Sequence, residues 1–151
     1  MKRTISCILI AIIFASILPL KGFAVNTEVT NITYFDDGSY MTETIYTFQT
    51  RASGTITGSK EKNFYGSDGV LEWKAILTGT FGYTGTNSVC TASSCNITIY
   101  DSAWYTISKS ATKSGNTAYA SVTMGEKRLG VTVNQVPASI TLTCDKNGNL
   151  S

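Results

Sequence analysis

The sequence predicts an all-β protein, most simply an antiparallel β-sandwich of about eight or nine short strands. Apolar and polar residues alternate with a period of two, most clearly between Leu71 and Phe81, as expected for strands with one buried and one wet face. Small and polar turn residues separate these runs, and no stretch after residue 24 has the period of a helix. Antiparallel strands with short connections favour a sandwich over a parallel α/β sheet.

The individual elements follow from the same alternation. The predicted strand segments include Leu71–Phe81, Cys95–Ile99, Ala118–Met124, Leu129–Val133 and Ile140–Cys144. Turns are expected at 36–38, 66–69, 101–102, 114–116, 125–126 and 145–148, where Gly, Asp, Asn and Ser gather. The 22 threonines of residues 25–151 suit the solvent face of a sheet, because β-branched side chains pack well on a pleated surface.

The chain begins with the three-part pattern of a secretory signal peptide. A basic start at residues 1–3 precedes the apolar run 7–20, which is shorter than the roughly 20 residues of a membrane-spanning helix. Small residues at Gly22 and Ala24 predict cleavage after Ala24. Residues 1–24 are therefore expected to be a signal peptide and residues 25–151 a single secreted, extracellular domain.

The charge balance argues against two classes of partner. Three of the 12 basic residues, Lys2, Arg3 and Lys21, fall in the predicted signal peptide, so nine basic residues face ten acidic ones and the net charge becomes about −1. No Lys/Arg stripe follows. Nucleic acid is therefore not expected as a partner, and neither is a membrane after signal cleavage.

Histidine is absent from the sequence, which limits the chemistry available to it. Ser-His-Asp and Cys-His nucleophiles are excluded, and so are zinc sites that contain histidine. We therefore expect no catalytic residues, no metal and no cofactor. The alternative is a hydrolase whose site is assembled from distant carboxylates such as Glu43, Glu72 and Asp101, since glycosidases need only two.

Three cysteines, Cys90, Cys95 and Cys144, remain after the predicted cleavage, and an exported chain favours pairing. The chain-entropy model favours a Cys90–Cys144 disulfide, worth roughly 4 kcal/mol, over the short Cys90–Cys95 loop. Alternation instead places Cys95 and Cys144 among inward-facing residues, which favours that pair. The expected disulfide is Cys90–Cys144, with Cys95–Cys144 left open.

The order Cys90, Trp104, Cys144 also parallels the Cys-Trp-Cys order of immunoglobulin domains, which supports an Ig-like architecture. Only seven residues follow Cys144, and Leu142 stands where those domains carry a tyrosine. The order therefore supports the architecture and not membership of that family.

Aromatic residues supply the candidate binding site. Trp104 follows a predicted turn with Tyr100 and Tyr105 close in sequence, and such rings can stack on the apolar faces of sugars. Trp73 lies on the apolar side of its strand and is expected in the core. Trp104 is either part of a sugar-binding platform or a second core residue.

Several short segments together resemble short exported proteins of unknown function from Gram-positive, clostridia-like bacteria. The resemblance covers about residues 30–151 and implies no activity and no functional residue. The segments that carry it are 77–81, 90–91, 100–104, 113–118, 129–131 and 142–144, which read LTGTF, CT, YDSAW, KSGNTA, LGV and LTC.

Two classes of function follow. The first is a non-catalytic extracellular binding or surface-interaction module, with a glycan or cell-wall polymer as its ligand. The second is the secreted hydrolase with a dispersed carboxylate site. A third possibility is a structural protein that assembles with copies of itself through exposed edge strands. The lack of histidine favours the first class over the second.

Overall fold

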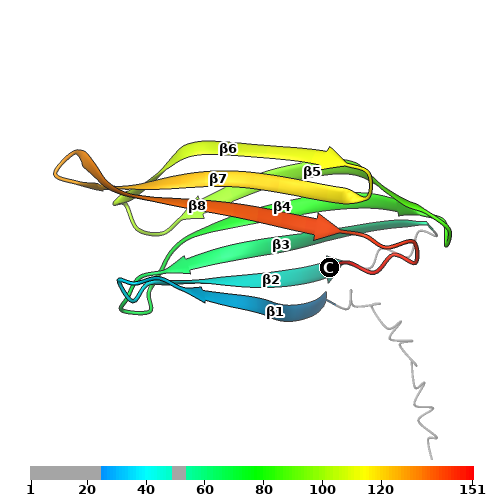
Figure 1. The fold of residues 1–151 in the computed structure, drawn as a ribbon, viewed down its shortest axis with the longest axis horizontal. Coiled ribbons are helices and arrows are strands. Elements are labelled where there is room, and N and C mark those ends of the chain that lie inside the picture. Colours follow the sequence, from blue (N-terminus) through cyan, green and yellow to red (C-terminus); the bar gives the residue numbers. More distant parts are fainter. Residues whose placement is uncertain (1–24, 49–53) are drawn as a thin grey trace, which may run out of the picture.

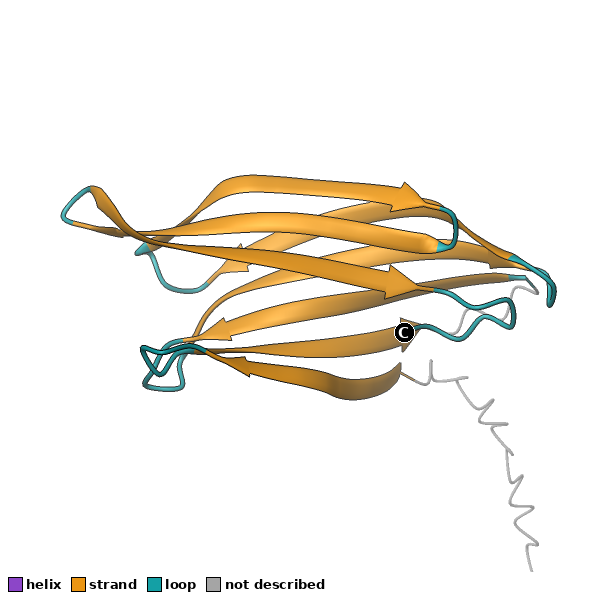
Figure 2. Cartoon of the chain, viewed as in Figure 1, coloured by secondary structure: helices purple, strands orange, loops and turns teal. Residues whose placement is uncertain are grey.

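The computed structural model describes residues 25–48 and 54–151, and in these ranges every regular element is a strand (Figure 2). The predicted signal peptide at 1–24 lies outside the described residues. Among the described residues there is no helix that is long and apolar enough to cross a membrane. The strands are β1 (Val25–Tyr34), β2 (Tyr40–Phe48), β3 (Thr55–Tyr65), β4 (Leu71–Tyr83), β5 (Ser88–Ile99), β6 (Trp104–Ser114), β7 (Thr117–Arg128) and β8 (Val131–Thr143).

The strands form two antiparallel sheets that pack face to face, which confirms the predicted β-sandwich (Figure 1). Sheet A has the order β1-β2-β3-β4-β5 and sheet B the order β6-β7-β8. Within each sheet, every strand therefore pairs with its neighbours in sequence, as in a meander, and the chain passes from sheet A to sheet B between β5 and β6. The Greek-key connections of immunoglobulin domains do not occur among the described strands.

The core lies between sheet A and sheet B, where the alternation in the sequence predicts it. Along β4, Trp73, Ala75, Leu77 and Phe81 are fully buried on one face. Sheet B supplies the opposing layer from alternate positions of β7 and β8. These opposing residues are Ala118, Ala120, Val122, Met124, Val136, Ala138, Ile140 and Leu142.

Three expectations about the strands are wrong in detail. The strands are long, with 9 to 13 residues each. The segments 129–133 and 140–144 were expected to be separate, but β8 runs unbroken from Val131 to Thr143. Gly125 lies inside β7, and the chain turns instead at Leu129 and Gly130, with φ values of 51° and 81°.

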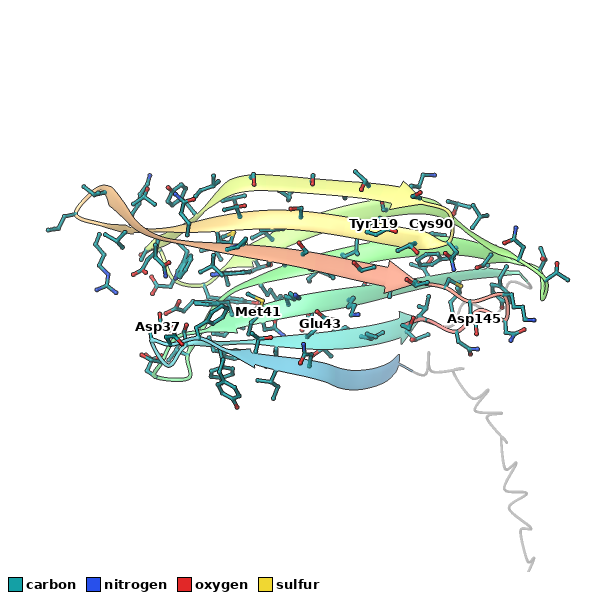
Figure 3. All side chains as sticks on the ribbon, viewed as in Figure 1. Asp37, Met41, Glu43, Cys90, Tyr119 and Asp145 are labelled. Atoms are coloured by element: carbon teal, nitrogen blue, oxygen red, sulfur yellow. The ribbon has the colours of Figure 1, made fainter. Side chains whose placement is uncertain are left out.

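Sheet B covers only part of sheet A. It contacts β3, β4 and β5, whereas β1 and β2 extend beyond it (Figure 1). The inner face of β2 is therefore partly uncovered, and Figure 3 shows Met41 and Glu43 there. The Glu43 carboxylate forms ion pairs with Lys60 at 2.8 Å and with Lys62 at 3.3 Å. One carboxylate therefore pairs with two ammonium groups on this inward-facing surface.

The predicted Cys90–Cys144 disulfide is not formed, and this expectation is corrected. Cys90, Cys95 and Cys144 are free thiols and all three are buried. Each of the two expected partners contacts a carbonyl of its own strand region: Cys90 Sγ lies 3.3 Å from the Ala92 oxygen, and Cys144 Sγ lies 3.4 Å from the Asp145 oxygen.

Candidate functional site

The predicted platform of Trp104, Tyr100 and Tyr105 is not formed, because the three rings lie in different environments. Trp104 is only 5% exposed and belongs to the core. Its ring packs edge-on against Phe64 at 5.1 Å and lies 6.0 Å from the Trp73 ring. Trp104 is therefore a core residue, the second of the two readings that the sequence left open.

Neither tyrosine replaces Trp104 as a stacking surface. The Tyr105 ring lies against Gly125, where an added Cβ would meet its carbons at 2.6 Å. The Lys127 ammonium sits over the same ring, 4.3 Å from its centroid, so the ring already has a cation as a partner. Tyr100 is 54% exposed and stands alone in the β5–β6 connection.

The structure instead brings three other tyrosines into a row. Tyr34, Tyr40 and Tyr65 are register partners across β1, β2 and β3, so their side chains share one face of sheet A. The Tyr40 and Tyr65 rings stack with centroids 4.7 Å apart and planes 9° from parallel. Tyr34 lies 5.7 Å from Tyr40 and is 73% exposed. We call these three residues the tyrosine row.

The tyrosine row lies on the outer face of sheet A, opposite the core. The neighbouring residue Phe64 points the other way and stacks on Trp73 at 5.2 Å inside the sandwich. Side chains alternate between faces along a strand, so Tyr65 must point outward. Sheet B packs against the inner face and leaves the tyrosine row accessible.

A hydrogen-bonded polar group continues from the tyrosine row along the same face. Glu61 Oε1 accepts hydrogen bonds from the Tyr46 hydroxyl at 2.8 Å and from Asn63 Nδ2 at 2.9 Å. Asn63 and Glu61 are both buried although they lie on an outer face. Neighbouring side chains therefore cover Glu61 and Asn63, and the hydrogen bonds hold the group in a fixed arrangement.

Tyr46 is kept in its protonated, donating form. Burial, the hydrogen bond to Glu61 and the charge of that carboxylate raise the pKa of Tyr46 to about 12. At neutral pH the phenol therefore remains a donor to Glu61. This fixes the orientation of the carboxylate on the sheet surface.

Hydroxyl groups extend this surface across to β4. Ser59 and Thr78 are linked by their side-chain oxygens at 2.8 Å, and Thr57 and Thr80 at 3.1 Å. From Tyr40 to Tyr46 the surface is about 20 Å long, at the usual rise of about 3.4 Å per residue. The face thus combines aromatic rings, hydroxyls, one amide and one carboxylate along an extended path.

The three carboxylates of the hydrolase alternative do not converge. Glu43 lies on the inner face of sheet A with its two lysines, whereas Glu72 and Asp101 meet at one end of the sandwich. There the Tyr100 and Asp101 amides both donate to the Glu72 backbone carbonyl. The backbones of Glu72 and Asp101 are therefore close together, and Glu43 lies apart from both.

The carboxyl group of Glu72 has a raised pKa. Burial raises the pKa of its carboxyl, the Trp104 indole N–H at 2.8 Å opposes this, and the charges of Asp101, Glu126 and Asp68 add to the rise. Gly66 leaves room for the other carboxyl oxygen, since a Cβ added at this glycine would lie 2.6 Å from that oxygen. Within the described residues, no group of three or more His, Cys, Asp or Glu side chains is arranged to hold a metal ion.

Part of the tyrosine row could have been predicted from the sequence, because two of its members lie on either side of a predicted turn. Tyr34 and Tyr40 flank the predicted 36–38 turn, so a hairpin there places them opposite each other. Tyr65 joins them only through the register of β2 and β3, which is set by contacts distant in sequence. Proximity in sequence led instead to Tyr100, Trp104 and Tyr105 as the predicted binding site.

No protein-family model matches this chain, and neither a curated protein nor a solved structure matches it significantly. The arguments about function therefore rest on the geometry described above.

Proposed function

We propose that this protein is an exported, non-catalytic module that binds a glycan or cell-wall polymer through the outer face of sheet A. The observation that carries the proposal is the tyrosine row with the Tyr46–Glu61–Asn63 group beside it on the same face. Tyr34 offers a ring face to solvent, and aromatic rings contribute both apolar contact area and a hydroxyl.

The remaining polar groups suit the same ligand class. A polysaccharide presents many hydroxyls, which need both donors and acceptors on the protein. The exposed hydroxyl of Tyr34 can both donate and accept, while the buried Glu61 and Asn63 hold the neighbouring part of the surface in place. Because Glu61 and Asn63 are already fixed by their neighbours, little side-chain entropy is lost when a ligand binds.

The first experiment compares binding of matched variants to insoluble cell-wall material and to a panel of neutral polysaccharides. Tyr34→Ala should weaken binding about tenfold, the equivalent of about 1.4 kcal/mol. Tyr119→Ala is the control, because Tyr119 is also an exposed tyrosine, 41% accessible, but lies in sheet B (Figure 3). Tyr119→Ala should leave binding unchanged.

Glu61→Gln tests the polar part of the surface separately. The amide keeps an oxygen that can accept from Tyr46 but loses the charge, so folding should persist while affinity falls. Equal binding by the wild type, Tyr34→Ala and Glu61→Gln would reject the outer face of sheet A as the site.

The hydrolase alternative has one supporting observation, the meeting of Glu72 and Asp101. It is tested in the same samples by measuring new reducing ends. Release of reducing ends that Glu72→Gln abolishes, with the tyrosine variants still active, would replace the binding proposal with catalysis at that end of the sandwich.

A further inference from the structure

The two sheets have four edge strands, and two of them protect each other. β5 and β6 lie side by side along one side of the sandwich. The Cys90 amide donates to the Gly115 carbonyl at 2.8 Å, and Lys113 Nζ donates to the Thr91 carbonyl. Backbone groups at the edge of β5 are thereby occupied by the β6–β7 hairpin.

The edge of β8 is protected by two other features. Thr143 exchanges hydrogen bonds with Ser151 at 2.9 and 3.0 Å, so Thr143 directs its backbone groups away from β7. β8 has no register shift between Pro137 and Thr143, and the two positions are an even number of residues apart. The backbone of Pro137 therefore also points away from β7. Proline has no N–H, so an added strand would meet a missing donor in the middle of this edge.

Among the described residues, no hairpin or C-terminal segment covers the edge of β1, and its one irregularity is a register shift between Val29 and Asn31. The sequence of Val25–Tyr34 contains no proline, lysine or arginine. The Phe35 N–H donates a hydrogen bond to the Ser39 carbonyl at 2.9 Å and so points toward β2. Because successive amides along a strand point in opposite directions, the N–H groups of Tyr34 and Ile32 point away from β2. Within residues 25–48 and 54–151, no backbone hydrogen bond outside the β1–β2 ladder reaches these two amides.

The shape of the sandwich leaves room for a second strand beside β1. Because sheet B contacts neither β1 nor β2, sheet A extends two strands beyond it (Figure 1). At about 4.8 Å per strand, sheet B stands back by roughly 10 Å from this edge. Two copies can therefore bring their β1 edges together without a clash between their B sheets.

We propose that β1 pairs antiparallel with β1 of a second copy of this chain, which joins two A sheets into one ten-stranded sheet. An antiparallel pair of identical strands is related by a two-fold axis perpendicular to the sheet, so the contact is closed and gives a dimer rather than a fibre. The same axis places both outer faces, and hence both tyrosine rows, on one side of the dimer.

The pairing is tested with residues 25–151, which include β1 to β8. Light scattering coupled to size exclusion should give twice the chain mass at high concentration and the chain mass on dilution. Hydrogen exchange should show the Ile32 and Tyr34 amides protected in the concentrated sample and unprotected in the dilute one, because only the partner strand can bond them.

Ile32→Pro removes the outward-pointing Ile32 N–H, which makes no hydrogen bond to β2. The variant should therefore be a monomer with an unchanged far-UV spectrum. Ile32→Lys, which places a charge at the edge, should do the same. The matched control is Thr141→Pro, because Thr141 has the same outward orientation as Thr143 on β8, and it should leave the dimer intact.

A chain that stays monomeric at every concentration overturns the proposal, as does a dimer that survives Ile32→Pro and Ile32→Lys. Loss of the dimer in Thr141→Pro would assign the contact to β8. The pairing does not depend on polysaccharide binding. If the proposed function holds, the dimer should bind a polymer at least tenfold more tightly than the wild-type monomer obtained on dilution, while short oligosaccharides bind both equally.

Discussion

The indole N–H of Trp104 donates a hydrogen bond to Glu72 Oε2 at 2.8 Å and so links the first residue of sheet B to sheet A. This bond joins a buried ring to a carboxyl at the end of the sandwich. It explains how Trp104 can lie in the core with its polar atom paired, whereas the buried Trp73 N–H has no hydrogen-bond partner within residues 25–48 and 54–151.

Trp104→Ala should lower the free energy of unfolding by about 3 to 5 kcal/mol, because it removes a large ring from contact with Phe64 and Trp73. Urea denaturation followed by far-UV circular dichroism measures the change. Tyr100→Ala is the control, and it should stay within about 0.5 kcal/mol of the wild type, since Tyr100 is exposed. A small effect of Trp104→Ala would contradict the core assignment.

The pH dependence of stability should carry a contribution from Glu72. Its pKa in the folded state is raised above the ordinary value of 4.5, so the folded protein binds this proton more tightly than the unfolded chain does. Stability from this group is therefore lost as pH rises from about 4.5 through the raised folded value. Glu72→Gln should remove this fall while the amide oxygen still accepts from Trp104.

Asp37 and Asp145 should act in the opposite direction and at lower pH. Hydrogen bonds from Ser39 lower the pKa of Asp37, and those from Asn149 lower the pKa of Asp145. Stability from these carboxylates is lost as pH falls below about 3.8, the ordinary value for both. Chemical denaturation at several pH values should show that Asp37→Asn changes the acidic limb and leaves the limb above pH 4.5 unaffected.

The three cysteines should behave as buried, unreactive thiols. Burial raises the pKa of Cys90, Cys95 and Cys144, and the thiolate is the reactive form. Folded protein comprising residues 25–151 should react slowly with an aromatic disulfide reagent at pH 8, and three thiols should react at once in denaturant without reductant. Only one reactive thiol, with an intact mass short by two hydrogens, would show a disulfide instead.

The fold was predictable from the sequence because the alternation along Leu71–Phe81 has one dominant inward face, which the structure confirms. The two predicted cysteine pairings illustrate the limit. Strict alternation puts Cys90 and Cys95 on opposite faces, but a bulge at Thr91 restores both to the buried side. A single extra residue of this kind leaves no trace in a period-two pattern.

The candidate site was less predictable for a related reason. The tyrosine row depends on the registers of two strand pairs, and register is set by packing of the whole sheet rather than by local sequence. The sequence near Trp104 offered three aromatic residues within six positions, yet their strand directions carry them to different surfaces. Compositional clustering was therefore a poor guide to clustering in space.

The β7–β8 turn provides a prediction of increased stability. Leu129 has a φ of 51°, and its side chain is fully exposed at 105% of the reference area. The left-handed conformation costs a leucine roughly 1 to 2 kcal/mol, and asparagine adopts it more readily. Gly130 follows with a φ of 81°, so Leu129→Asn creates the Asn-Gly pair that favours a two-residue hairpin turn.

Leu129→Asn should therefore raise the free energy of unfolding by about 0.5 to 1 kcal/mol, which thermal and urea denaturation both detect. The matched control is Val131→Asn, two positions further on, where the exposed side chain lies in β8 and asparagine is disfavoured in a strand. This control should be neutral or destabilising. If Leu129→Asn lowers stability instead, the exposed leucine makes contacts that offset its backbone strain, and the turn is not the source of that strain.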